Sequence, residues 1–179
     1  MRTIAVVNQK GGRGKTTTAI NTAAAFAMQG QRVLLVDLDP QAHATIGLGH
    51  DPDAFDCTVY DLLIRSQDGL DDVVVHTRTN GLHLVPCNVL LASADLELGA
   101  IPGKELLLGR SMRDARQDYD FCVIDCPPSL GVLTLNALVA STDIIVPVQV
   151  HYYALEGLKR LLETIHVIRD RFHPDAMEN

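Results

Sequence analysis

The stretch "VNQKGGRGKTTTAIN", residues 7–21, decides how this sequence folds. It places three glycines and a Lys-Thr pair between an apolar run and a stretch of helical character, the order expected of a phosphate-binding loop between a strand and a helix. The loop departs from the strict G-x-x-x-x-G-K-[ST] pattern, because Gln9 stands where the first glycine belongs. It also carries a second lysine, Lys10, besides the required Lys15. The use of Lys10 is the question that this loop raises.

Each part of the loop has a physical use in holding phosphate. Glycine lets the backbone come close and turn its N–H groups inward, and a helix beginning near Lys15 adds its positive dipole end. Lys15 would lie along the phosphate oxygens, and the Thr16 hydroxyl is a hard oxygen ligand for Mg²⁺. The alternative is a glycine-rich turn that only joins a strand to a helix. The G-x-G-K-T pattern at a strand–helix junction favours the nucleotide site.

Short apolar runs alternate with amphipathic stretches along the rest of the chain. Strands are predicted at 3–8, 32–39, 72–77, 82–87, 119–128 and 143–150, and helices at 15–29, 58–66, 88–98, 103–117, 133–142 and 154–172. Residues 44–49 are predicted to form a short helix or a turn. Buried runs without polar alternation, each followed by a helix, indicate parallel strands with right-handed crossovers. We therefore expect an α/β fold: a three-layer, doubly wound, mostly parallel sheet of the P-loop NTPase class.

Acidic residues follow two of the predicted strands. Asp37 and Asp39 end the second strand and Asp125 ends "FCVID", so all three lie at the edge where parallel sheets bind ligands. Asp125 is predicted to hold Mg²⁺, with a capping acid as the less favoured alternative. Asp39 would orient or activate the attacking water, or would serve as a capping acid; residue chemistry alone leaves these two roles equally weighted.

The composition narrows the class of protein. The 179 residues suffice for one domain with a real core, and a net charge of −7 argues against a broad basic surface for nucleic acid. The first residues form an apolar run too short for a signal peptide, and no apolar run reaches transmembrane length. The four cysteines lack zinc-ribbon spacing and are predicted to be buried thiols in a reducing cytoplasm.

Four stretches together resemble the ParA/Soj chromosome- and plasmid-partition ATPases, within the larger group that includes MinD. They are "KGGRGKTTT" (10–18), "LLVDLDPQ" (34–41), "YDFCVIDCPPSLGVLTLNAL" (119–138) and "VPVQVHYYALEGL" (146–158). Members of this family have a deviant Walker A motif with a signature lysine, and Lys10 matches it. The resemblance implies a dimer that sandwiches two ATP molecules, in which each signature lysine reaches the partner's nucleotide.

The resemblance also implies roles for individual residues. Lys10, Lys15 and Asp39 would be catalytic, and Thr16, Asp39 and Asp125 would be placed at the metal. The nucleotide-binding set would be Lys10, Gly11, Gly12, Arg13, Gly14, Lys15, Thr16 and Thr17. The implied cofactors are ATP and Mg²⁺.

The implied partners are a second copy of the chain, a ParB-like activating protein and non-specific DNA, without a membrane, at the nucleoid in the cytoplasm. Support for DNA binding in the residues themselves is weak. The arginines at 110, 113 and 116 are typical of a solvated helix face, and the last predicted helix offers a slightly better set: Lys159, Arg160, Arg169 and Arg171. Two alternatives stay open: a MinD-like or cargo-positioning ATPase, and a non-catalytic nucleotide-binding interaction module.

Three departures from the family pattern stand out. Arg13 replaces a small apolar residue, and would strengthen phosphate binding, crowd the dimer interface or point harmlessly to solvent. "QAHAT" (41–45) stands where many relatives have Gln-Gly-Asn-Ala-Thr, with His43 expected in an exposed loop. The chain is also short, so residues 1–179 are expected to form a single P-loop ATPase domain that lacks the C-terminal part of its relatives.

Overall fold

The computed structural model describes residues 1–64, 69–113, 117–148 and 154–172. Six strands form one sheet in the order β3-β4-β2-β5-β1-β6. They are β1 (Arg2–Val6), β2 (Val33–Asp37), β3 (Val75–His76), β4 (Leu82–Val85), β5 (Phe121–Asp125) and β6 (Asp143–Ile145). All neighbouring pairs are parallel except β3 with β4. The predicted fold class, a mostly parallel α/β sheet of the P-loop NTPase type, is confirmed.

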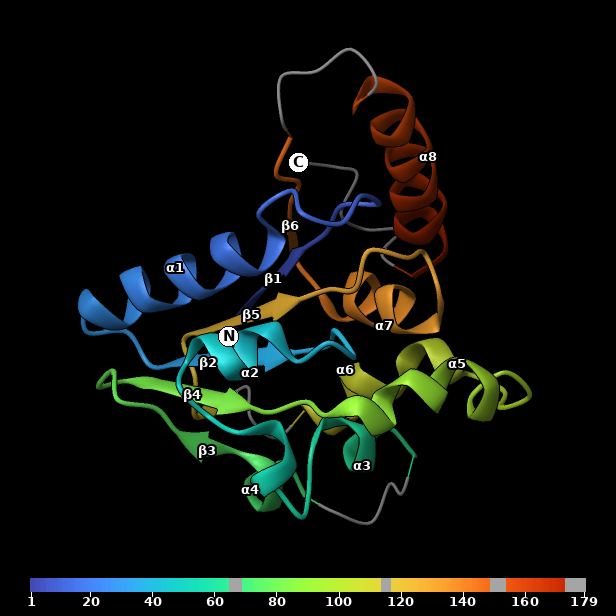
Figure 1. The fold of residues 1–179 in the computed structure, drawn as a ribbon. Coiled ribbons are helices and arrows are strands. Elements are labelled where there is room, and N and C mark those ends of the chain that lie inside the picture. The colour runs from blue at the N-terminus through green and yellow to red at the C-terminus, as the bar shows by residue number, and fades with distance from the viewer. Residues whose placement is uncertain (65–68, 114–116, 149–153, 173–179) are drawn as a thin grey trace.

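Helices cover both faces of the sheet, and Figure 1 shows α1 on one side and α7 with α8 on the other. The α-helices are α1 (Lys15–Met28), α2 (His43–Gly47), α3 (Val59–Ile64), α4 (Leu70–Val73), α5 (Ala94–Glu97), α6 (Leu107–Ser111), α7 (Val132–Ala140) and α8 (Ala154–Phe172). Short 3₁₀ turns lie at Pro52–Ala54, Val89–Ser93 and Lys104–Leu106. No helix in the described part of the chain is both long and apolar enough to span a membrane.

Alternate residues of each strand enter two separate cores. Leu35 and Val123 pack with the buried alanines of α1, whereas Leu34 and Ile124 join the larger core beneath α3, α6 and α7. The alternation follows from the two-residue period of a strand, and small residues on α1 let that helix approach the sheet closely. The phosphate loop therefore connects the buried strand β1 to the closely packed helix α1.

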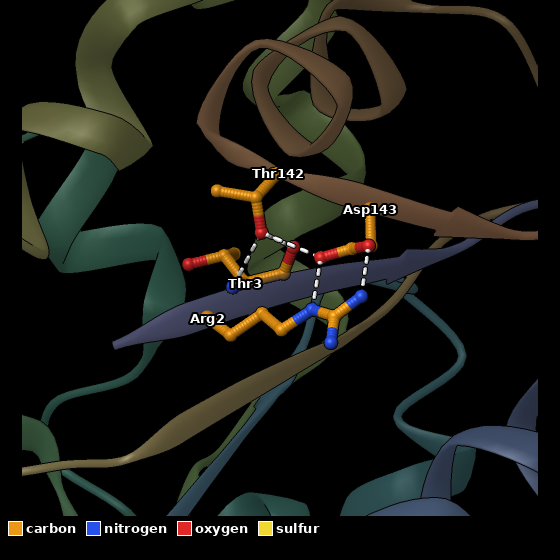
Figure 2. Close-up of polar contacts among 4 residues, drawn as sticks. All are labelled: Arg2, Thr3, Thr142 and Asp143. Carbon is orange, nitrogen blue, oxygen red and sulfur yellow. Dashed lines mark hydrogen bonds and ion pairs between the residues drawn. The ribbon is translucent and has the colours of Figure 1, made fainter. Parts of the chain in front are cut away.

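Side chains at the start of β1 hold β6 in register. The Arg2 guanidinium donates to both carboxylate oxygens of Asp143, at 2.7 and 2.6 Å (Figure 2). The Thr142 hydroxyl accepts from the Thr3 backbone N–H and donates to the Thr3 carbonyl, both at 3.0 Å. Because the Arg2–Asp143 pair is exposed, it adds little stability, and its contribution is to fix where β6 begins.

Several predicted elements needed correction. The predicted strand 72–77 begins as the single-turn helix α4, because the Asp72 carboxylate accepts from the Gly69 N–H (3.0 Å) and Leu70 and Val73 are buried one turn apart. Strand β6 ends at Ile145, before the predicted end at 150. The predicted helix 88–98 divides into a 3₁₀ turn capped by Asn88 and then α5, and the predicted helix 103–117 divides into a 3₁₀ turn and α6. Residues 114–116 and 149–150 of these predictions lie outside the described part.

Three of the four cysteines are buried, as predicted. These are Cys87, Cys122 and Cys126, whereas Cys57 is half-buried, and none of the four forms a disulfide. Burial raises the pKa of Cys122 to about 12, so this thiol is protonated and unreactive at neutral pH.

Candidate phosphate-binding site

The glycine-rich loop follows β1 and forms the N-terminus of α1. Gly12 and Gly14 have φ angles of 68° and 81°, a left-handed conformation that glycine adopts without the steric cost of a Cβ. Gly14 is the N-cap of α1 and provides no side-chain acceptor for the first turn. A Cβ added at Gly11, Gly12 or Gly14 would meet no protein atom within 4 Å. The loop therefore leaves space for an anionic ligand close to its backbone, and it borders a cavity of about 510 Å³.

The two lysines of the loop have different surroundings. The Lys15 side chain is only 6% exposed, and its ammonium donates to the Lys10 carbonyl at 3.3 Å, across the loop. The Lys10 residue itself is exposed, and its backbone N–H donates to Asn8 Oδ1 at 3.1 Å. Lys15 thus belongs to the interior of the phosphate loop, whereas Lys10 stands at its outer entry.

Asp125 lies beside the loop at the carboxyl end of the sheet. It is aligned with Val6 of β1 on one side and with Asp37 of β2 on the other. It is fully buried, and neither carboxylate oxygen has a hydrogen-bond partner of normal geometry among the described residues. Burial raises the pKa of Asp125 to about 7, although the nearby Thr16 hydroxyl and Lys15 ammonium oppose this shift. A buried carboxylate without a partner, beside a threonine hydroxyl, fits a hard cation such as Mg²⁺.

The two acids at the carboxyl end of β2 occupy different environments: Asp37 is the last residue of the strand, and Asp39 follows it. Asp37 is fully buried, and one of its oxygens accepts from both the backbone N–H and the hydroxyl of Thr45, each at 2.7 Å. Burial raises the pKa of Asp37 to about 6, against these hydrogen bonds. Asp39 accepts from the Gln41 N–H at 3.0 Å and lines the cavity beside the loop. Asp37 therefore anchors α2, and Asp39 is the acid of this pair that faces the ligand space.

Thr45 is a residue whose importance the sequence did not indicate. Its hydroxyl donates to Asp37 and accepts from the backbone N–H of Cys87 at 3.0 Å, which joins α2 to the end of β4. Ala42 lies three residues before Thr45 and has a φ angle of 53°. It is the only non-glycine residue with a positive φ among the described residues. An L-residue in this conformation costs about 1–2 kcal/mol, a cost that glycine at this position would avoid. The departure "QAHAT" thus carries local backbone strain.

Other predicted residues cluster around the same cavity. Its lining includes the nucleotide-binding residues predicted from the sequence, except Lys10, together with Asp39, Gln41, His43 and Pro128. Arg13 is half-buried and also borders a cavity of about 220 Å³ with Lys10 and residues of α8. Arg13 therefore borders both the ligand cavity and the smaller cavity next to α8. His43 is exposed, as expected, but it lies at the rim of the ligand cavity.

The candidate DNA-binding residues lie on α8, and Arg110 of the predicted solvated set is exposed on α6. Lys159 lies 4.0 Å from the Glu163 carboxylate, one turn further along α8. Arg169 and Arg171 are exposed in the last turn of that helix. Arg116 lies outside the described residues. These cations do not form one dense basic surface in the described part, where Glu163 and Asp170 are interspersed with them.

Comparison with known proteins gives the family. A family model described as an AAA domain matches residues 1–177. The sporulation initiation inhibitor protein Soj of Bacillus subtilis is 46% identical over 174 residues, which cover 97% of this chain and 68% of Soj. The chromosome partitioning protein ParA of Myxococcus xanthus is 44% identical, over 97% of this chain and 61% of that protein. The chain belongs to the Soj/ParA family. It spans about two thirds or less of these curated relatives' length.

Solved structures of similar chains carry nucleotide. The cobyrinic acid a,c-diamide synthase from Mycobacterium smegmatis, solved with bound ADP and magnesium, is 44% identical with a TM-score of 0.93, and the match covers 98% of this chain and 71% of that one. A putative plasmid partition protein from Borrelia burgdorferi, bound to AMPPNP, is 29% identical with a TM-score of 0.82, over 94% of this chain and 71% of that one. Soj/ParA-type chains thus share this fold with proteins that bind adenine nucleotides and magnesium.

Proposed function

We propose that this chain binds and hydrolyses ATP with Mg²⁺ and acts as an ATP-dependent dimer switch in chromosome or plasmid segregation. The observation that carries the proposal is the buried carboxylate of Asp125, which has no hydrogen-bond partner of normal geometry in the described part and lies beside an open glycine loop. Its position next to Thr16 and Lys15 combines a cation site with a phosphate site. The similarity to nucleotide-bound relatives supports ATP and Mg²⁺ as the ligands.

In this proposal, each residue of the site binds either the phosphates or Mg²⁺. The N–H groups of Gly11, Gly12 and Gly14 and of the first turn of α1 bind phosphate oxygens, and Lys15 neutralises their charge. The complete nucleotide-binding set is Lys10, Gly11, Gly12, Arg13, Gly14, Lys15, Thr16 and Thr17. Thr16 and Asp125 hold Mg²⁺, with Asp39 close to it. When bound, Mg²⁺ supplies a positive charge that offsets the charge developing on the phosphates.

Hydrolysis requires a group that orients water at the terminal phosphate. Asp39 is the acid at the rim of the ligand cavity, and its carboxylate is already oriented by the Gln41 N–H. We assign it that task, with Asp37 as a positioning residue that holds α2 through Thr45. Lys10, exposed at the loop entry, is assigned to the nucleotide of the partner subunit. The dimer is then held together by ATP and released by hydrolysis.

The partners follow from the family and belong to the same proposal. They are a second copy of the chain, a ParB-like activator and non-specific DNA, with the protein acting at the nucleoid in the cytoplasm and not at a membrane. Residues 1–179 would serve as a single ATPase domain. Relatives that position protein cargo, or that bind nucleotide without turnover, are the alternatives. DNA retention that requires ATP and falls with salt supports partition, and absent steady-state turnover supports the non-catalytic alternative.

A second candidate function is ATP-dependent amide synthesis, because a cobyrinic acid a,c-diamide synthase is as similar to this chain as the partition proteins are. Such an enzyme would consume ATP only when its acid substrate and an amine donor are present. ATP hydrolysis by the chain alone, unchanged by cobyrinic acid and glutamine, favours the partition-type switch. Turnover that depends on both additions favours the synthase.

Lys15→Ala is expected to weaken Mg·ATP binding by about 10- to 100-fold, because a charged hydrogen bond to phosphate contributes about 1.5–3 kcal/mol. Titration with a fluorescent ATP analogue measures the affinity. Lys159→Ala is the matched control, since it removes an exposed lysine of α8 and should bind as the parent does. Equal affinity in Lys15→Ala and the parent would contradict the phosphate role of this lysine.

Asp39→Ala is expected to keep ATP binding within a few-fold of the parent and to slow hydrolysis about 100-fold or more, the usual contribution of a positioned acid–base group. Steady-state phosphate release and nucleotide titration on the same samples separate these two effects. Asp53→Ala, which removes an exposed acid in the Pro52–Ala54 turn, is the control. Turnover at the parental rate would refute the assignment of Asp39.

A further inference from the structure

Two histidines face each other at the edge of the sheet. His76 of β3 is directly aligned with His83 of β4, and their ring centroids are 4.4 Å apart at an interplanar angle of 84°. The backbone N–H of Thr77 donates to the Leu82 carbonyl at 3.3 Å, so this neighbouring pair is hydrogen-bonded and the His76–His83 pair is of the non-hydrogen-bonded type. That type brings Cα atoms to about 4.5 Å, the closest approach across an antiparallel pair.

A third side chain orients one of these rings. The Nδ1 atom of His83 lies 2.7 Å from the Tyr119 hydroxyl, which comes from the segment just before β5. Burial raises the pKa of Tyr119 to about 12, so this hydroxyl stays protonated at neutral pH. When Nδ1–H donates to the hydroxyl oxygen, Nε2 of His83 carries a free lone pair. Metal-binding histidines are commonly fixed in this way through their second nitrogen.

The surroundings suit a cation. Asp71 of α4 and Asp118 raise the pKa of Tyr119 through their negative charges, so both carboxylates lie within electrostatic reach of the hydroxyl that contacts His83. His83 is half-buried, and burial lowers the pKa of its imidazole, with the neighbouring His76 adding to the shift.

We propose that His76 and His83 form a two-histidine binding site for a divalent transition metal such as Zn²⁺. A metal about 2.1 Å from each Nε2 in tetrahedral geometry holds two imidazole centroids about 5 Å apart, close to the 4.4 Å between the His76 and His83 rings. Imidazole nitrogen favours Zn²⁺, Cu²⁺ and Ni²⁺ over Mg²⁺. The described part contains no group of three or more such ligands, so water completes the coordination.

This site is separate from the nucleotide site. His83 is aligned with Leu34 near the amino end of the parallel strands, whereas the phosphate loop and Asp125 lie at their carboxyl ends. Strand β3, at the outer edge of the sheet beyond β4 in Figure 1, consists of two residues. A bound metal would tether this short edge strand to β4, so the site adds a metal-dependent stabilisation that does not rely on ATP.

Zn²⁺ titration of the nucleotide-free chain, followed by calorimetry, tests the proposal. We expect one Zn²⁺ per chain, and at least a tenfold weaker affinity in both His76→Gln and His83→Gln. Tyr119→Phe is expected to bind about 10-fold more weakly while keeping the site, the usual cost of losing the group that orients a ligand. His166→Gln, which removes an exposed histidine of α8, is the control and should match the parent. Parental affinity in His83→Gln would overturn the proposal.

A measurement on the unaltered chain covers the case in which a variant fails to fold. The chain has seven histidines, and NMR of their imidazole Cε1–H signals reports each ring separately. Sub-stoichiometric Zn²⁺ is expected to shift two of the seven signals. These two signals are assigned to residues by comparing the parent spectrum with that of His166→Gln and with that of His76→Gln or His83→Gln, whichever folds. The binding should also weaken in acid, because protons compete with the metal for imidazole. Equal shifts of all seven signals, or none, would refute the site.

Discussion

Asp125→Asn is expected to make the nucleotide-free chain more stable at pH 8 while largely abolishing Mg²⁺-dependent ATP binding. In the parent, the Asp125 carboxylate is buried and has no partner of normal geometry in the described part. Ionising it in that place costs free energy, which the pKa of about 7 records. A neutral asparagine avoids this cost. We expect a gain of about 2 kcal/mol, which is about 4–8 °C in Tm for a chain of this size.

The gain should depend on pH in one direction. The pKa of Asp125 in the folded chain, about 7, exceeds its ordinary value of 3.8, so the folded state holds this proton more tightly than the unfolded state. The parent therefore loses stability as pH rises from about 4 to 7, and Asp37, with a pKa of about 6, adds to that loss. At pH 4 the parent carboxyl is protonated, and the advantage of Asp125→Asn should largely vanish.

Thermal melts at pH 4 and pH 8, with and without Mg·ATP, measure these effects together. Asp118→Asn is the matched control, because it removes an exposed aspartate shortly before β5 and should change Tm little at either pH. Mg·ATP should raise the Tm of the parent and of the control, but not that of Asp125→Asn. A lower Tm for Asp125→Asn at pH 8, or unchanged Mg·ATP binding, would contradict the cation role.

Lys10→Ala is expected to leave ATP binding to the monomer nearly intact and to abolish ATP-dependent dimerisation and most hydrolysis. Lys15 already lies buried inside the loop, where it reaches the Lys10 carbonyl at 3.3 Å, so its ammonium serves the chain's own nucleotide. Lys10 is exposed at the loop entry. A cation there neutralises phosphate charge only when a second subunit brings its nucleotide close, which makes the dimer depend on ATP.

Light scattering with a non-hydrolysable ATP analogue tests the dimer, after the parent has been shown to dimerise under the same conditions. Lys159→Ala is the control for the loss of an exposed lysine. Dimerisation of Lys10→Ala equal to that of the parent would refute the role in the partner's site.

Mixing two inactive variants gives a second, independent readout. In a dimer of one Lys10→Ala subunit and one Asp39→Ala subunit, one site keeps both its own Asp39 and the partner subunit's Lys10. An equal mixture should therefore recover at most about a quarter of the parental hydrolysis, the value reached if the two subunits pair at random and each mixed dimer has one intact site. If Lys10 acts on its own nucleotide, no site is complete and no activity returns.

The sequence by itself determined the central strands, helix α1 and the phosphate loop. Strands β1, β2 and β5 are continuous apolar runs, and α1 begins at Lys15 as predicted, directly after the three glycines. These features are local: an apolar run excludes solvent-facing structure, and glycines before a Lys-Thr pair report a backbone conformation that few other residues adopt. The convergence of Asp37, Asp39 and Asp125 at one edge was also predictable, because parallel strands bring their carboxyl ends together.

Only the tertiary structure separated the roles of those three acids. Asp37 and Asp39 are two residues apart, yet one binds Thr45 from α2 and the other lines the ligand cavity. Asp125 is left without a hydrogen-bond partner of normal geometry in the described part by the strands on either side of it. Burial and partner atoms come from segments far apart in the sequence, so no local pattern specifies them.

The same reason explains the short elements and the second site. The one-turn helix α4 and the early end of β6 depend on which core and which neighbouring strand each segment meets, and these contacts override local propensity. His76, His83 and Tyr119 lie in three separate segments of the chain. Their contact exists only because β3 pairs with β4 in one register and because Tyr119, just before β5, contacts His83 on β4. Composition and spacing identify the loop, whereas strand register and burial decide which side chains meet.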